Sequence, residues 1–264
     1  MTNKISNLIS ASLRNKHKIL SAYIMPGFPD YNSTFKICRA AMDAGVDFIE
    51  LGIPFSDPLA DGVVIQKSAQ VAIGNGITPR KVLEIADEVT RKFPLPVIAM
   101  GYYNSFLNGI GHEFMSELAR CGVSGLIIPD LSYEESSTVA ENAKANEISL
   151  VMLIAPTSDD ERIKKISQLS SDFCYCVSVT GVTGVRKSLV TEEVRGFLQR
   201  VRKNSLKPFV VGFGISNPES AREISLFSDG IVVGSALLER VSADGGLHVY
   251  ENAYEFLKSL RDAL

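Results

Sequence analysis

The sequence predicts an α/β protein, a single (β/α)₈ TIM barrel that spans residues 1–264 as one domain and carries an additional N-terminal helix. Three observations predict it. Eight short apolar runs rich in β-branched residues recur along the chain, amphipathic stretches separate them, and no Ser/Gly-rich linker interrupts the alternation. The length of 264 residues by itself fits either one large domain or two small ones.

Each apolar run is expected to form a buried parallel strand, because it is short and is bounded by Gly, Pro, Asp or Asn. The runs are residues 19–26, 47–54, 96–103, 125–130, 148–156, 173–179, 208–214 and 229–238. A doubly wound open sheet is the alternative fold. It normally has fewer strands, and no GxGxxG motif follows the first run, so the barrel is favoured.

Helical patterns lie between these runs. The first 20 residues alternate polar and apolar side chains at helical spacing and predict the N-terminal helix. Asn32 or Ser33 is expected to cap the next helix, which Gly45 ends, and Pro79 suits the first turn of another. The helix that contains Pro79 is expected at residues 78–92, and the remaining helices are expected at residues 111–122, 158–172, 217–227 and 248–264.

Composition limits the class of protein. Hydrophobic residues make up 45% of the chain, charged residues 22%, and the formal net charge is −3, as in soluble globular proteins. No nucleic-acid or membrane partner is therefore expected. Three scattered histidines and the absence of CxxC spacing argue against a metal site. Buried, reduced thiols in a cytoplasmic protein are expected for Cys38, Cys121, Cys174 and Cys176.

Glycine-rich segments follow the sixth, seventh and eighth runs: TGVTG at 180–184, GFGIS at 212–216 and VVGSA at 232–236. Glycine lets the backbone approach an anion closely, and Ser235 would open a short helix with free N–H groups. Any one of these segments alone could merely turn the chain. Together, at the ends of three neighbouring barrel strands, they predict a phosphate site.

Glu50 interrupts the second apolar run. Alternation places it on one face with Phe48 and Gly52, pointing into the barrel near the carboxyl end of the strand. Burial should raise its pKa, which suits a group that gives and takes a proton near neutral pH. The alternative is a structural Glu paired with Arg or Lys, but no basic residue falls within any predicted strand.

The side chains that follow are less decisive. Asp57 and Asp61 lie in the next loop, where Asp61 either caps the helix after Gly62 or belongs to a site. Tyr102 and Tyr175, near the ends of the third and sixth runs, belong either to the core or to an aromatic ligand pocket.

Several of these segments together resemble one known family. ELGIPFSDPLADG at 50–62, together with GVTG, GFGIS and GSA after the last three runs, closely resembles the α subunit of tryptophan synthase. The match continues through AGVDFIELGIP, MGYYN and GLIIPDL and covers nearly the whole chain. It implies a barrel whose bottom is closed by the N-terminal helix.

The resemblance implies retro-aldol cleavage of indole-3-glycerol phosphate to indole and D-glyceraldehyde 3-phosphate, with no cofactor in this subunit. Glu50 would be the general acid and base. Asp61 would accept a hydrogen bond from the indole N–H and stabilise the charge that develops on the ring. Thr183 would orient that aspartate when the loop after the sixth strand closes. The carried-over phosphate contacts are Gly184, Phe213, Gly214, Gly234 and Ser235. The carried-over indole pocket is Tyr23, Tyr102, Ile127, Leu153, Tyr175 and Val232.

The family also implies a partner. Its members work as an αββα heterotetramer in which indole passes through a tunnel to a β subunit that holds pyridoxal phosphate. Asp57 matches a position implicated in the contact between the subunits.

Five positions depart from the usual family pattern: Val63, Val64, Ser105, Ser132 and Val179. A valine in place of proline at position 63 could loosen the loop that aims Asp61, which puts the catalytic rate in doubt rather than the substrate. The alternative is therefore a weakly active or inactive α subunit that mainly activates its β subunit. Another phosphate-binding barrel enzyme is a third possibility. It would normally use a strand lysine or a Cys/Asp pair at strand ends, but no predicted strand contains a lysine, and the placement of Glu50 and Asp61 does not fit that chemistry.

Overall fold

The computed structural model describes residues 3–177, 191–212 and 214–264 and contains a closed barrel of eight parallel strands, each hydrogen-bonded to the next. The strands are β1 Ile19–Ile24, β2 Phe48–Gly52, β3 Val97–Met100, β4 Gly125–Ile127, β5 Ser149–Ile154, β6 Cys174–Cys176, β7 Phe209–Val211 and β8 Gly230–Val233. β8 pairs with β1 and closes the sheet. The predicted barrel and all eight strands are confirmed, and the doubly wound sheet is excluded.

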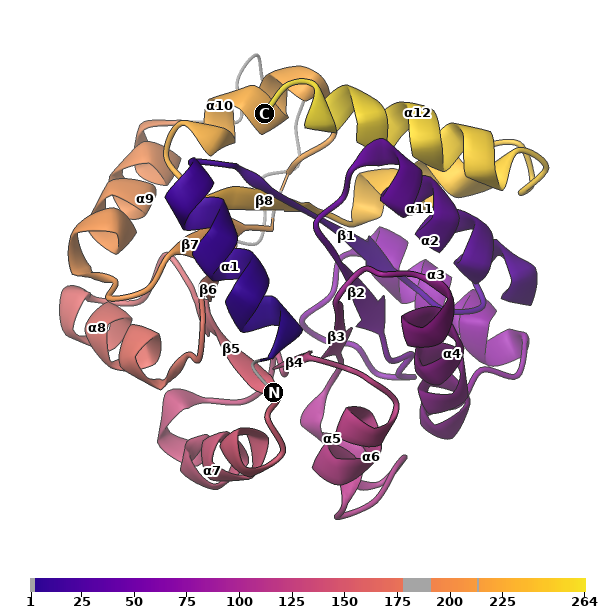
Figure 1. Ribbon diagram of the computed structural model, residues 1–264, viewed down its shortest axis with the longest axis horizontal. Helices are drawn as coiled ribbons and strands as arrows, with labels where there is room; N and C mark the ends of the chain where they lie inside the picture. Colours follow the sequence, from indigo (N-terminus) through magenta and orange to yellow (C-terminus); the bar gives the residue numbers. More distant parts are fainter. Residues whose placement is uncertain (1–2, 178–190, 213) are drawn as a thin grey trace.

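Helices surround the barrel (Figure 1). They are α1 Lys4–Asn15, α2 Tyr31–Ala44, α3 Val63–Gly74, α4 Pro79–Lys92, α5 Tyr103–Leu107, α6 Phe114–Arg120, the 3₁₀ turn η1 Tyr133–Glu135, α7 Ser137–Ala145, α8 Asp160–Leu169, α9 Glu192–Asn204, α10 Pro218–Ser225, α11 Ser235–Ser242 and α12 Val249–Arg261. Apart from α1, their apolar faces pack against the outer face of the sheet and contribute to the larger of two hydrophobic clusters.

The smaller cluster fills the inside of the barrel with side chains from alternate strand positions, such as Phe48, Phe173 and Val210. Ile5 and Ile9 of α1 belong to the same cluster. In Figure 1 this helix lies across one end of the barrel. The N-terminal helix is therefore confirmed, and it closes the end opposite the carboxyl ends of the strands.

Some local predictions differ from the structure. The cap of α2 is Asp30, whose carboxylate accepts from the N–H groups of Asn32 and Ser33, so the expected Asn32 or Ser33 cap is wrong. Gly45 ends α2 in the left-handed conformation and Pro79 begins α4, as expected. Three helices were not predicted: α5, α7 and α9. Thr191 as a cap and the two acids after it signal the start of α9, but no helix was expected there.

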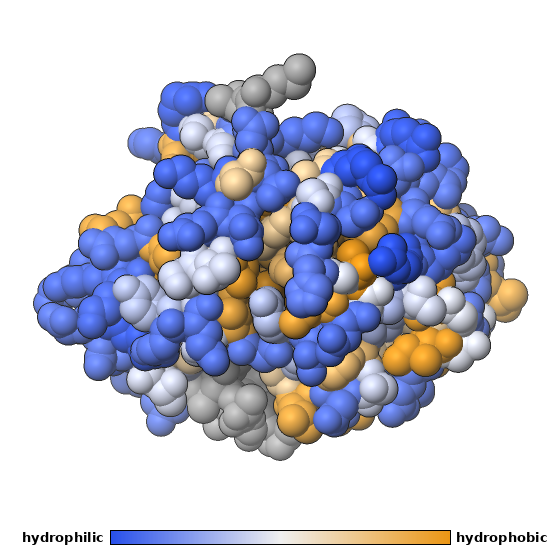
Figure 2. All heavy atoms as spheres, turned by 90° about the horizontal axis from the view of Figure 1, so that it is seen from below, coloured by the Kyte–Doolittle hydropathy of each residue, from blue (hydrophilic) through white to orange (hydrophobic). Residues whose placement is uncertain are grey.

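The surface is mainly hydrophilic on the face shown in Figure 2, where hydrophobic atoms appear between polar side chains. All four cysteines are buried and free, as expected. Within the described residues, no helix combines the length and the apolarity needed to cross a bilayer.

Candidate active site

Glu50 lies inside the barrel in β2, directly across from Tyr23 of β1. Its side chain is completely buried. Ser21, two residues before Tyr23 on the same strand face, donates a 3.2 Å hydrogen bond to Glu50 Oε1, whereas Glu50 Oε2 has no hydrogen-bond partner among the described residues. Phe48, on the same face of β2, belongs to the apolar interior cluster. One carboxyl oxygen is thus left buried and unpartnered above an apolar floor.

This environment raises the pKa of Glu50 from 4.5 to about 8, because burial penalises the charged form more than the Ser21 hydrogen bond favours it. Among the described residues no lysine or arginine pairs with Glu50, so they give no support to the alternative of a structural ion pair. The carboxyl group is therefore protonated at neutral pH and holds a proton that it is able to transfer. Such a group is a candidate general acid.

Two buried tyrosines share the barrel interior with Glu50. The pKa of Tyr23 and that of Tyr175 are both raised well above the usual value by burial and, further, by the charges of Glu50 and Asp61. Both carboxyl groups therefore lie within electrostatic reach of both rings. The aromatic-pocket reading of Tyr175 agrees with this position.

Glycines leave the space that these tyrosines occupy. A Cβ atom on Gly52 would lie 2.2 Å from the Tyr23 hydroxyl, and one on Gly212 would lie 1.9 Å from the Tyr175 hydroxyl. Any side chain at either glycine would displace a tyrosine beside Glu50. Gly52 shares the strand face of Glu50, and Ser21 shares that of Tyr23, so alternation places both residues toward the barrel interior, but neither role was predicted.

Asp61 does not cap α3. The N-cap of that helix is Gly62, and no side chain caps it. Instead, the Tyr102 hydroxyl donates to the Asp61 carboxylate and accepts from the Ala60 N–H at 2.9 Å. Burial raises the pKa of Asp61 to about 6, while the Tyr102 hydrogen bond opposes the rise. Asp61 is therefore mostly ionised at neutral pH, when Glu50 is mostly protonated.

Tyr102 lies just beyond the carboxyl end of the third strand, as predicted. It follows β3 and precedes α5, and its ring packs on Phe55 at a centroid distance of 5.3 Å. Its hydroxyl is occupied by the loop that carries Asp61. It is therefore at least as much a support for this loop as a wall of a pocket. Phe55 was not singled out from the sequence.

The remaining pocket residues face the barrel interior, since Ile127, Leu153 and Val232 pack in its cluster. Asp57 is exposed. Two of the residues that depart from the family pattern are serines. The buried Ser105 hydroxyl has no hydrogen-bond partner among the described residues, and the Ser132 hydroxyl donates to the Glu135 carboxylate at 2.7 Å. The fifth departure, Val179, lies outside the described residues.

At the proposed phosphate site, Ser235 begins α11 as predicted, and Gly234 is its N-cap with no side-chain cap. The first N–H groups of this helix have no partner within the helix. Gly214 adopts a left-handed conformation, φ +67°. The other predicted contacts, Gly184 and Phe213, and the predicted orienting residue Thr183 lie outside the described residues.

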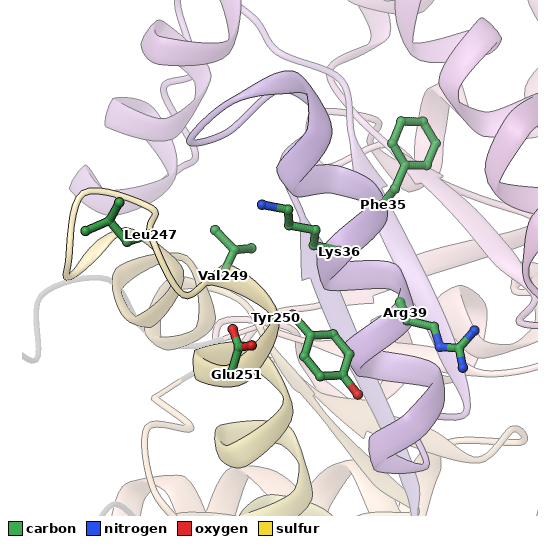
Figure 3. Close-up of a pocket in the computed structure, with 7 residues that line it drawn as sticks. All are labelled: Phe35, Lys36, Arg39, Leu247, Val249, Tyr250 and Glu251. Atoms are coloured by element: carbon green, nitrogen blue, oxygen red, sulfur yellow. The ribbon is translucent and has the colours of Figure 1, made fainter.

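A separate groove lies on the outer helical layer, between α2 and the start of α12 (Figure 3). In Figure 3, Tyr250 lies beside Arg39. Both donate hydrogen bonds to Asp43 Oδ2, the Tyr250 hydroxyl at 3.0 Å and Arg39 Nε at 2.8 Å. None of the predicted site residues lines this groove.

The departure at Val63 leads to a prediction. Val63 is the first residue of α3, a position that proline favours, and its side chain is 79% exposed. Gly62 before it already has φ −72° and ψ 162°, which suits a residue that precedes proline. Val63→Pro is therefore expected to raise the free energy of unfolding by about 0.5–1 kcal/mol, measured by urea denaturation.

The matched control is Val64→Pro, one residue further into the helix. Proline there would force Val63 out of its helical conformation, so this variant is expected to be less stable than the parent. Equal destabilisation by both substitutions would contradict the assigned helix start.

The fold and the site together define a class: a (β/α)₈-barrel protein with two carboxyl groups of raised pKa near the carboxyl ends of its strands. The family model described as tryptophan synthase alpha chain matches residues 9–264. The chain belongs to the tryptophan synthase alpha chain family.

Individual relatives agree. The tryptophan synthase alpha chain of Dehalococcoides mccartyi is 45% identical over 249 residues, which cover 94% of this chain and 96% of the relative. The alpha chain of Chlorobium luteolum is 43% identical, and the match covers 99% of this chain and 100% of the relative. Among solved structures, the alpha subunit from Legionella pneumophila superposes with a TM-score of 0.91 at 30% identity, covering 100% and 98%. A chain of the Pyrococcus furiosus tryptophan synthase complex superposes with a TM-score of 0.83 at 31% identity, and the match covers 92% of this chain and 97% of that one.

Proposed function

We propose that this chain is the lyase subunit that cleaves indole-3-glycerol phosphate to indole and D-glyceraldehyde 3-phosphate. The observation that carries the proposal is the Glu50 carboxyl group, buried, unpartnered at Oε2 and with its pKa raised to about 8. The cleavage needs a group that first gives a proton to a carbon atom and then takes one from a hydroxyl group. A carboxyl group that is protonated at neutral pH and has one free oxygen is suited to both steps.

In the first step, protonated Glu50 gives its proton to C3 of the indole ring. This breaks the aromaticity of the five-membered ring and leaves positive charge on the ring nitrogen. Asp61, ionised above a pKa of about 6, accepts a hydrogen bond from the N–H and stabilises that charge. The two carboxyl groups hold opposite protonation states at pH 7, as the step requires.

In the second step, the Glu50 carboxylate takes the proton of the hydroxyl group on the glycerol carbon attached to C3. The carbon–carbon bond breaks, its electron pair returns to the ring, and an aldehyde and indole are released. Glu50 ends the cycle protonated, as it began. We propose that this chain uses no cofactor for the reaction and that pyridoxal phosphate belongs to the β subunit.

We further propose that the chain assembles with a β subunit in an αββα complex in the cytoplasm and that indole passes between the subunits. Support comes from the loop after β2, where Asp57 is exposed and Leu59 is 86% exposed. An apolar side chain held in water beside a charge is suited to a protein contact. The same loop carries Asp61, so a partner that touches it would influence the acid in the site.

The deciding experiment incubates the purified chain with indole-3-glycerol phosphate, with and without its β subunit, and measures release of glyceraldehyde 3-phosphate. Release by the chain alone that rises with the β subunit is the expected result. No release in either mixture would exclude the lyase. Activation of the β subunit without release would favour the alternative, a purely regulatory subunit.

Ser235→Asp tests the phosphate site. An aspartate at the first position of α11 suits the helix dipole, so the fold is expected to remain stable, but its charge opposes a phosphate group there. KM for indole-3-glycerol phosphate is expected to rise at least tenfold, a loss of about 1.4 kcal/mol in binding. Steady-state kinetics give the value.

Ser137→Asp is the matched control, since Ser137 is the first residue of α7 and is exposed. It adds the same charge at the same helical position and is expected to leave KM within about twofold. If both variants raise KM equally, the phosphate does not bind at the start of α11.

A further inference from the structure

Gln66 is a residue of α3 to which the proposed reaction assigns no role. Its side-chain amide donates to the main-chain carbonyl of Asp61 at 2.8 Å and also approaches that of Pro58 at 3.4 Å. These two carbonyl groups bracket the turn that precedes the helix. One side chain, a turn inside α3, therefore holds both ends of the segment that carries Asp61.

The start of α3 is built differently from that of most other long helices in the described structure. Side-chain oxygens cap six other starts, Asn3 at α1, Asp30 at α2, Thr78 at α4, Asp159 at α8, Thr191 at α9 and Asn217 at α10, whereas the starts of α6, α7, α11 and α12 have no side-chain cap. Gly62 caps α3 and offers no side chain. Gln66 does not replace such a cap, because its amide donates to carbonyl groups rather than accepting from the free N–H groups, but it ties the preceding turn to the helix.

A second brace comes from the barrel. The Tyr102 hydroxyl, after β3, accepts from the Ala60 N–H at 2.9 Å. Within the turn itself, the Asp61 N–H donates to the Pro58 carbonyl at 3.1 Å. Tyr102 thus holds the segment on the side of the barrel and Gln66 holds it on the side of α3, with Asp61 between them.

From these contacts we infer that Gln66 is a positioning residue: by holding the carbonyl groups of Asp61 and Pro58, it keeps the Asp61 carboxylate turned into the barrel, where the indole N–H would meet it. This inference rests on the proposed function, which gives Asp61 its partner. Gln66 itself touches no reacting group. Displacement of a catalytic group by about 1 Å is enough to lower a rate by up to roughly 100-fold.

Gln66→Met is the test variant, because methionine has similar length and helix propensity but no donor. Gln70→Met is the matched control: Gln70 lies one turn further along α3 and is exposed. The expected result for Gln66→Met is a fall of at least tenfold in kcat with KM within about threefold, while Gln70→Met keeps the parental values. Urea unfolding of all three proteins establishes that each is folded during the assay.

The second readout does not depend on turnover. The Asp61 carboxylate is titrated by ¹³C NMR in the parent and in both variants. Freed from its brace, the carboxylate gains water, so its midpoint is expected to fall by roughly one pH unit or more in Gln66→Met only. An unchanged midpoint in Gln66→Met overturns the inference, whatever the rate. A lowered midpoint with an unchanged kcat overturns it as well. If the parent does not cleave the substrate, the proposed function fails, and the titration still decides whether Gln66 holds Asp61.

Discussion

Glu50→Gln is expected to lower the rate of indole-3-glycerol phosphate cleavage by roughly 10²- to 10⁴-fold, the usual loss when a general acid–base group is removed. Glutamine keeps the size of the side chain and still accepts the Ser21 hydrogen bond, so KM is expected to stay near the parental value. It has no proton to give to the ring carbon and no carboxylate to take one back. Retention of more than about a tenth of the rate would refute the assigned role.

The same variant makes a second, independent measurement possible. The folded pKa of Glu50, about 8, lies above its value of 4.5 in the unfolded chain, so the folded state holds the proton more tightly. The contribution to stability is therefore fully present below pH 4.5 and is lost as the pH rises through 8. Each pH unit in this window removes up to about 1.4 kcal/mol from the parent.

Glutamine does not titrate and escapes this loss. Between pH 6 and pH 8, the free energy of unfolding of Glu50→Gln relative to the parent is expected to rise by about 2–3 kcal/mol. Urea denaturation at the two pH values provides the comparison. Glu141→Gln, an exposed position in α7, is the control and is expected to show no such trend. A parallel pH dependence in parent and Glu50→Gln would mean that Glu50 is not held protonated.

Asp61→Asn has the second-largest expected effect, a fall of about 100-fold or more in kcat. The amide is nearly isosteric and still accepts a hydrogen bond from the indole N–H, but it carries no charge to oppose the positive ring. In the parent, kcat/KM is expected to decline above pH 8, where Glu50 loses its proton. Because Asp61 is not among the causes that set the pKa of Glu50, the same decline is expected in Asp61→Asn. A persisting decline identifies Glu50 as the group that still transfers the proton.

Asp57→Asn is the companion variant in the same loop. Asp57 is exposed and lies on the proposed partner surface. Cleavage by the isolated chain is expected to change less than about twofold, whereas its stimulation by the β subunit is expected to fall. Equal losses of rate in Asp57→Asn and Asp61→Asn would show that the loop as a whole, rather than the Asp61 charge, is needed.

Local sequence pattern predicted the buried position of Glu50 but left the position of Asp61 open, for a physical reason. Strand alternation determines which way a residue of β2 points, so the burial of Glu50 and the rise in its pKa followed from local pattern. Asp61 before Gly62 looks the same locally whether it caps a helix or faces the barrel. Its partner, Tyr102, is 41 residues away and is brought to it only by the closed sheet.

The contacts that support the site from distant parts of the sequence could not be predicted, for the same reason. Ser21 and Gly52 lie on the strand faces of Tyr23 and Glu50, yet alternation does not reveal that the hydroxyl reaches Glu50 or that Gly52 makes room for Tyr23. Gln66 reads as an ordinary helix residue until the turn before it is seen. By contrast, the strands and the barrel were predictable because apolar runs, turn residues and spacing are all local.

The pairing of β8 with β1 has a consequence for synthesis on the ribosome. β1 begins at residue 19 and β8 at residue 230, a separation of 230 − 19 = 211 residues. At a translation speed of roughly 5–20 residues per second, the second strand needed to close the sheet emerges about 10–40 seconds after the first. During that interval one edge of β1 has unsatisfied backbone groups and no permanent neighbour, so the newborn chain remains exposed to misassembly until β8 has been made.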